Sequence, residues 1–165
     1  MATSAVPNAI TQLLAILRAR PELQPGVEGP DSPPGVQVID GPPTDDISRD
    51  DLIAVGWSFD GDQAVEIAQD FNAAGARTRN ENFAITGVID VWSGDDSVAA
   101  ARDRVFELFG VLEMAVRASG SNPDAPNLNG AVLWAHITRG VLRQSYTDQG
   151  VRAGLAFTVT CHARI

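Results

Sequence analysis

Apolar and polar residues alternate most regularly over residues 151–165. Every second position there is apolar: Val151, Ala153, Leu155, Phe157, Val159, Cys161, Ala163 and Ile165. Because successive side chains of a strand point to opposite faces, this pattern predicts a long strand with one buried face. Just upstream, residues 132–138 fit a strand that is apolar on both sides for part of its length, since Val132 and Trp134 alternate with Leu133, Ala135 and Ile137. We therefore expect the chain to end in a long β-hairpin.

Shorter patterns predict the other strands of the sheet. Residues 36–39 and the apolar run 52–57 each fit a strand, and the run 52–57 fits a buried one. Residues 64–72 fit a helix as well as a strand. The small residues at 73–76 are typical of a hairpin tip and favour the strand. Its partner is expected at 81–92, where Phe83, Ile85, Ile89 and Val91 share one face.

Helical spacing appears in two segments. In residues 8–20 the apolar positions are Ile10, Leu13, Leu14 and Leu17, with Pro7 suited to the first turn and Pro21 ending the helix. In residues 97–118 the apolar stripe consists of Val105, Leu108, Phe109, Leu112 and Val116, and Asp95, Asp96 or Ser97 can cap its start. The order of elements predicts an α+β fold: a mostly antiparallel sheet, a long helix on one face, and an N-terminal helix.

Prolines and glycines interrupt the chain after the first helix. Residues 21–43 contain seven prolines and four glycines, which excludes regular structure apart from the strand at 36–39. We expect an extended arm or a long surface loop at about 21–35. The helix before it is too small to fold alone, so residues 1–165 are predicted to form one domain.

Composition excludes several classes of protein. A hydrophobic share of 44% and a charged share of 20% are ordinary for a globular domain and exclude disorder of the whole chain. The apolar stretch 9–17 is broken by Thr11 and Gln12, so no membrane span or signal peptide is expected. The single cysteine, Cys161, excludes an internal disulfide and a multi-cysteine zinc site, and it favours a reducing compartment.

Charge is distributed unevenly along the chain. The net charge is −9, and all twelve basic residues are arginine. Residues 21–66 hold eleven acidic residues and only Arg49, a net of −10, which leaves +1 for the remainder. This distribution argues against gripping nucleic-acid phosphates. The acidic stretch fits a solvated loop region, or a face that meets a basic partner or repels nucleic acid.

Few residues offer catalytic or metal-binding chemistry. Cys161 and His162 are neighbours in a strand and point to opposite faces, so they cannot form a nucleophile–base pair, and Cys161 is expected to be a buried, inert thiol. His136 and His162 could meet across the terminal hairpin, but no carboxylate is spaced to complete a metal site. The adjacent acids Asp45-Asp46, Asp50-Asp51 and Asp95-Asp96 fit solvated or capping positions. No phosphate-binding loop or nucleophile elbow occurs. We predict no catalytic, cofactor or metal site and no enzyme.

A set of ordered landmarks runs along nearly the whole chain. They are the N-terminal helix with Leu13, Leu14 and Leu17; Val36-Gln-Val-Ile-Asp-Gly-Pro-Pro43; Leu52-Ile-Ala-Val-Gly56; Arg79-Asn-Glu-Asn-Phe-Ala-Ile85; the helix from Arg102 to Val116; and Gln144-Ser-Tyr-Thr-Asp-Gln-Gly150 leading into Phe157-Thr-Val-Thr-Cys-His-Ala-Arg164. In their order and spacing they resemble the tail terminator proteins of long-tailed bacteriophages, also called head–tail joining or minor tail proteins.

The resemblance implies a structural virion protein without a cofactor. Such proteins form a hexameric ring that caps the tail tube and joins it to the head connector, so the implied partners are further copies of the chain, the major tail tube protein and a connector or stopper protein. DNA would pass through the lumen without specific binding. The implied location is the head–tail junction of the virion, after assembly in the host cytoplasm. Two alternatives stay open: another neck protein, such as a head-side stopper or adaptor, and a small-molecule-binding α+β module.

Overall fold

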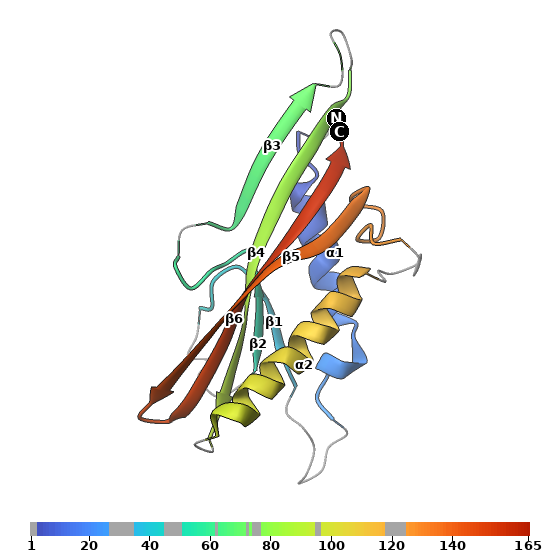
Figure 1. Ribbon diagram of the computed structural model, residues 1–165. Coiled ribbons are helices and arrows are strands. Elements are labelled where there is room, and N and C mark those ends of the chain that lie inside the picture. The colour runs from blue at the N-terminus through green and yellow to red at the C-terminus, as the bar shows by residue number, and fades with distance from the viewer. Residues whose placement is uncertain are drawn as a thin grey trace.

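The protein is a twisted sheet with helices packed on one side (Figure 1). The computed structural model describes residues 3–26, 35–44, 51–61, 63–71, 73, 77–94, 97–117 and 125–165. Within these ranges the elements are α1 (Val6–Arg18), a 3-10 helix (Pro21–Leu23), β1 (Gln37–Asp40), β2 (Leu52–Val55), β3 (Val65–Phe71), β4 (Arg79–Ser93), α2 (Val98–Arg117), β5 (Trp134–Thr147) and β6 (Gly150–Arg164).

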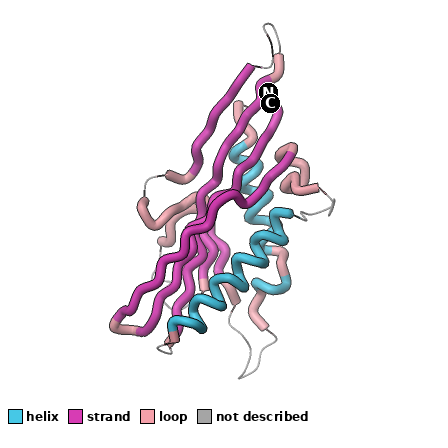
Figure 2. The backbone as a smooth tube through the Cα atoms, in the orientation of Figure 1, coloured by secondary structure: helices cyan, strands magenta, loops and turns pink. Residues whose placement is uncertain are grey.

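The long strand β4 organises the sheet. Along one side it pairs with β6 over nearly its whole length, and β5 pairs antiparallel with β6 beyond. Its other side is shared: β3 pairs antiparallel with residues 79–85, and β2 pairs antiparallel with residues 87–90. Only β1 is parallel to its neighbour, β2. Figure 2 shows that the long strands twist strongly from one end of the sheet to the other.

The predicted fold class is confirmed. The structure is α+β, with one long helix, an N-terminal helix and a mostly antiparallel sheet. A strand within 64–72 is confirmed as β3, which pairs antiparallel with β4, while residues 72 and 74–76 of the predicted hairpin tip lie outside the described residues. The terminal hairpin is present, but its first strand runs over residues 134–147 rather than 132–138. Helix α2 packs against β4, β5 and β6, and α1 packs against α2 and β1.

The hydrophobic core lies between the sheet and the two helices. The apolar positions predicted for the last strand are buried from Val151 to Ala163, as are those predicted for β4. Four of the five residues predicted as the stripe of α2 are buried, while Phe109 is partly exposed at its edge. The apolar residues that alternate along β4 and β6 therefore pack against the apolar stripe of α2 in one core.

A glycine in the middle of β4 makes room for the largest core side chain. Gly87 pairs across the strands with Phe157, and a Cβ atom on Gly87 would lie 2.2 Å from the Phe157 ring and 2.6 Å from the carbonyl oxygen of Ala54. Glycine is therefore needed here, because any side chain at this position would overlap the Phe157 ring.

Several element boundaries differ from the predicted ones. Helix α1 spans residues 6–18 rather than 8–20, because Glu81 holds its first turn by a contact that is distant in sequence. Strand β2 ends at Val55 rather than at Trp57, because Gly56 turns the chain with a φ of +77°. Of the predicted arm at 21–35, residues 27–34 lie outside the described residues, and Leu23 before them is buried in the core.

The packing of α2 gives a direct stability prediction. Leu112 is fully buried, whereas Met114 on the same helix is 47% exposed. Leu112→Ala should lower the free energy of unfolding by about 2–5 kcal/mol, because it leaves a cavity in the core. Met114→Ala is the matched control and should change it by less than about 0.5 kcal/mol. Chemical denaturation measures both, and equal effects of the two substitutions would contradict this placement of the helix.

Candidate functional site

The face of the sheet opposite the helices, called the open face below, carries the polar side of the alternation. The register of the strands places on it Asn82, Thr86, Asp90 and Trp92 from β4, Arg152, Thr158, Thr160 and His162 from β6, and Trp134, His136, Arg139, Val141 and Arg143 from β5. No helix of the described chain packs on this face. The polar side chains of the open face are therefore the candidates for a functional site.

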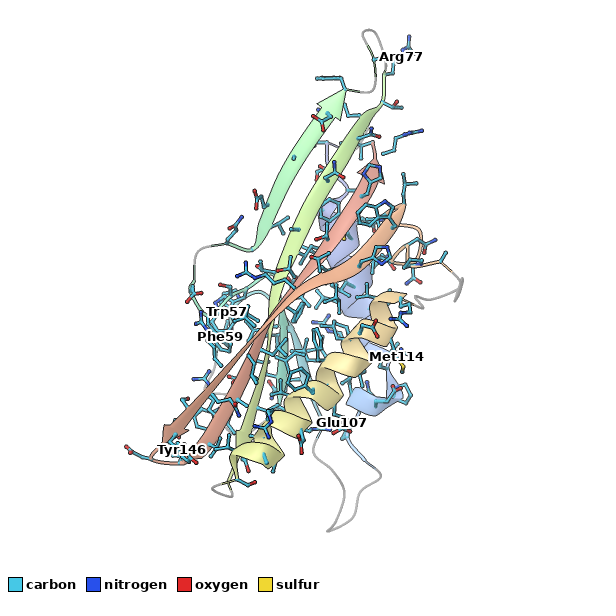
Figure 3. The ribbon with its side chains drawn as sticks, viewed as in Figure 1. Trp57, Phe59, Arg77, Glu107, Met114 and Tyr146 are labelled. Atoms are coloured by element: carbon cyan, nitrogen blue, oxygen red, sulfur yellow. The ribbon has the colours of Figure 1, made fainter. Side chains whose placement is uncertain are left out.

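One cluster on the open face joins an aromatic ring to two arginines. The ring of Phe59, from the turn after β2, lies over Gly154, where a Cβ atom would be 2.6 Å from it. The guanidinium carbons of Arg143 and Arg152 lie 6.0 Å and 5.6 Å from the centre of that ring. Figure 3 shows Phe59 beside Trp57 against the middle of the sheet, with ring centres 5.7 Å apart. These contacts fasten the turn onto the open face.

Carboxylates neutralise both arginines of this cluster. Arg143 binds Asp60 through two nitrogens at 3.1 Å and 2.9 Å, and its hydrogen bonds lower the pKa of Asp60. Arg152 binds Asp90 with a shortest distance of 2.6 Å, and this hydrogen bonding raises the pKa of Arg152. The positive charge is thus already matched by partners that are distant in sequence.

A shallow hollow of about 180 Å³ lies next to the cluster. Its polar lining comes from Ser58, Asp60, Thr86, Arg139, Arg143 and Thr158. Arg139 is exposed and makes no ion pair within the described part of the chain. Arginine and hydroxyl donors of this kind suit a small anion.

The two histidines contact one tryptophan at the other end of the open face. Trp134 stacks on both imidazoles, with ring centres 5.4 Å from His136 and 5.6 Å from His162. A nitrogen of His162 lies 2.7 Å from the Oδ1 atom of Asn82. Within the described residues no group of three or more His, Cys, Asp or Glu side chains could hold a metal ion. Both histidines thus contact the same indole ring, and the register pairs His136 with Thr160 and His162 with Trp134.

The remaining candidate residues that the structure describes are buried in the core or paired within the fold. Cys161 is fully buried and on the opposite face from His162, and burial raises its pKa to about 12. Asp51 forms an ion pair with Arg104 of α2 at 2.8 Å. The other predicted acid pairs, Asp45-Asp46, Asp50 and Asp95-Asp96, lie outside the described residues.

One functional-looking carboxylate was missed by sequence reasoning. Glu81 is fully buried, yet it accepts a hydrogen bond from the Ala5 backbone N–H at 2.7 Å and one from Gln69 at 2.7 Å. Burial disfavours its charged form, but these hydrogen bonds outweigh burial and lower the pKa of Glu81. The carboxylate lies at the N-terminal end of α1, where the helix dipole favours negative charge. Glu81 therefore anchors α1 to the sheet and is not free for chemistry.

Two long strands, β3 and β5, form edges of the sheet. Strand β3 pairs only with β4, and strand β5 pairs only with β6, so each has one side without a strand partner in the described chain. Six of the seven residues of β3 are exposed, including Phe71 with 74% of its surface accessible. At the far end of β5, Tyr146 is 70% accessible, near the tip of the hairpin in Figure 3.

Comparisons with known proteins do not assign the chain to a family. No protein-family profile matches it. No curated protein sequence matches it significantly. Among the described helices, none has the length and apolar character needed to cross a membrane.

The role of Glu81 predicts how stability depends on pH. Because its pKa is lower in the folded protein than its usual 4.5, its stabilising contribution is present above pH 4.5 and is lost as pH falls through the lowered value. Glu81→Gln should cost about 1–3 kcal/mol at neutral pH and flatten the loss of stability in acid. Denaturation at a series of pH values checks this, with exposed Glu22→Gln as the control. A wild-type acid profile in Glu81→Gln would contradict the anchoring role.

The burial of Cys161 predicts its reactivity. A thiol with a pKa of about 12 holds almost no thiolate at neutral pH. A maleimide should therefore label the native protein very slowly and the denatured protein at once. Cys161→Ser should leave the fold intact and lower the free energy of unfolding by about 1–3 kcal/mol, because it buries a hydroxyl. Rapid labelling of the native protein would show that the last strand is not buried.

Proposed function

We propose that the chain is a structural virion protein, a tail terminator whose six copies form a ring that caps the tail tube and joins it to the head connector. The ordered landmarks along nearly the whole sequence favour this protein class over other ring-forming proteins. The function needs no cofactor and no catalytic step. Its partners are further copies of the chain, the major tail tube protein and the connector or stopper protein.

The observation that carries the proposal is the pair of unlike sheet edges. A closed ring needs two different, complementary surfaces on each subunit, which is a heterologous interface. Strands β3 and β5 are opposite edges of the segment β3-β4-β6-β5, and neither has a second strand partner among the described residues. Long exposed edges with apolar side chains are usually blocked in a monomer, because they add strands from other molecules. In a subunit of a ring, the same exposed edges would pair with strands of neighbouring copies.

The position in the virion follows from this role. The ring would stand at the head–tail junction after assembly in the host cytoplasm, and DNA would pass through its lumen without specific binding. The acidic stretch within residues 21–66 would supply like charge that lets DNA slide. It would also distinguish the terminator from another tube ring, because like charges disfavour a wrong partner.

Another neck protein, a head-side stopper or adaptor, is the alternative within the same class. It would use the same ring-forming edges and differ only in whether its ring meets the tail tube or the portal side. The sequence landmarks favour the tail side.

A small-molecule-binding module is the alternative of a different class, and the hollow on the open face is the feature in its favour. Its volume of about 180 Å³ is below the ~300–1,000 Å³ of typical ligand pockets. One of its two arginines, Arg143, is already bound by Asp60. The hollow therefore supports this alternative weakly compared with the two free edges.

The terminator assignment predicts the phenotype of a phage that lacks the protein. Tails should grow beyond their normal length, because nothing stops addition of tube rings, and filled heads should accumulate without tails. Electron microscopy of lysates measures both, and supplying the protein in trans should restore normal tails.

Two other outcomes separate the alternatives. Tails of normal length that fail to join would favour the stopper or adaptor. Normal tails and normal joining, together with loss of a metabolic activity, would overturn the structural assignment.

A further inference from the structure

We propose that β3 of one copy pairs antiparallel with β5 of the next copy, so that Asp70 faces Arg139 and Glu66 faces Arg143. This interface rests on the proposed ring. It adds the pair of strands and the register through which the copies join, neither of which the ring by itself specifies. The partner of each edge is thus a second copy of this chain.

Strand β3 presents an acidic row and an apolar row. Glu66 and Asp70 pair with Ala84 and Asn80 of β4, which places both acids on the open face. Ile67 and Phe71 lie on the helix side of the same strand and are 49% and 74% exposed. No basic residue occurs in Val65–Phe71. An edge of this kind favours a partner with basic residues on one face and apolar residues on the other.

Strand β5 offers that partner. Arg139 and Arg143 pair with Thr158 and Gly154 of β6, which places both arginines on the open face, and no acidic residue occurs in Trp134–Thr147. Leu142 and Tyr146 lie on the helix side of the strand, opposite Leu155 and Val151. The two edges are therefore complementary in charge on one face, and on the other face each carries apolar side chains with one glutamine between them, Gln69 in β3 and Gln144 in β5.

The spacing of the charges fixes one register. The two acids and the two arginines are each four residues apart, so an antiparallel pairing brings both charge pairs together at once. In this register Ala68 faces Val141 on the open face, and Ile67 faces Leu142 on the helix side. A slip of one residue would move every side chain of β3 to the wrong face.

The outer backbone edge of this part of β5 has no strand partner within the described chain, and the side chain of Arg143 on it is shared with Asp60 of the same copy. Near the start of the strand, the Ala135 N–H donates to the carbonyl oxygen of Pro126 at 2.7 Å, so the preceding loop occupies that part of the edge. A bulge follows between Ile137 and Arg139. The regular edge therefore begins at Arg139, where the proposed pairing begins. Asp70, like Arg139, forms no ion pair with any residue in the described ranges.

The direction of the strands agrees with a closed ring. Within one copy β3 and β5 run in opposite directions. A rotation about an axis that runs broadly along the strands keeps the direction of every strand. The β3 strand of one copy therefore meets the β5 strand of the next copy in an antiparallel arrangement. Within a copy Glu66 is level with His136, through Ala84 and Thr160, seven residues before Arg143. Because of the bulge in β5, the same interval spans six residues of β6, from Thr160 to Gly154, so each copy is displaced along the strands by about 20 Å. A sheet closes on itself only with such stagger and tilt.

Charge reversal tests the register. Asp70→Arg and Arg139→Asp should each raise the concentration needed for ring formation by at least about tenfold, because like charges would then face each other. A 1:1 mixture of the two variants should form rings again. In an alternating hexamer every interface has one acid and one arginine at this position. Light scattering and analytical ultracentrifugation measure the assembly state.

Matched controls use the exposed face of α2. Asp103→Arg and Arg102→Asp make the same changes of charge at exposed positions away from both edges. Both should assemble like the wild type. Circular dichroism and thermal unfolding of all four variants show whether any loss of assembly reflects loss of the fold.

The outcomes separate this inference from the proposed function. Rings from the single variants at the wild-type concentration, or a mixture that stays unassembled, would overturn the pairing of β3 with β5 while the ring remained. A wild-type protein that is monomeric at every concentration would overturn both. A third outcome combines two results: the rings depend on this pairing, but a phage that lacks the protein still makes normal tails. This outcome would overturn the terminator role and leave the pairing of β3 with β5 intact.

Discussion

The antiparallel ladder between β4 and β6 is the interaction on which the rest of the structure depends. It runs from Asn80 opposite Arg164 to Ser93 opposite Val151, and both faces of it are used. On the helix side it supplies the core that α2 covers, with Gly87 making room for Phe157. On the open face it places Asp90 beside Arg152, and β6 positions Gly154 under Phe59. Residues far apart in sequence meet only because this pairing has one register.

The same ladder explains why the protein has two unlike edges. Because β4 is long, it can pair with β2 and β3 on one side and with β6 on the other, which leaves β3 at one edge and β5 at the other. Ion pairs within the subunit engage Asp60, Asp90 and Asp51. By contrast, Asp70 on the β3 edge and Arg139 on the β5 edge form no ion pair within the described chain. Asp70 and Arg139 are therefore left for contacts between subunits, whereas Arg143 serves both purposes, because it binds Asp60 within the subunit and faces Glu66 of the next copy in the proposed pairing.

Sequence periodicity predicted the elements well where one period dominated. The alternation of residues 151–165 and the helical stripe of residues 97–118 specified β6 and α2, because each buries one face against a single core. Contacts between distant segments could not be predicted in this way. The start of α1 depends on Glu81, and the folding of the turn at Phe59 onto the sheet depends on Gly154 and Arg143. The stacking of Trp134 on two histidines also required the register of β5 against β6.

Cross-linking at the proposed subunit contact tests the central claim most directly, namely that copies join edge to edge in a ring. Ala68→Cys and Val141→Cys in one chain would place two thiols opposite each other between copies, while native Cys161 stays buried. A short bismaleimide should then give a ladder of covalent products up to six chains, about 105 kDa for six copies of 17.5 kDa. Each single-cysteine variant should give no such ladder. Monomers alone, or dimers and nothing larger, from the double variant would contradict the account.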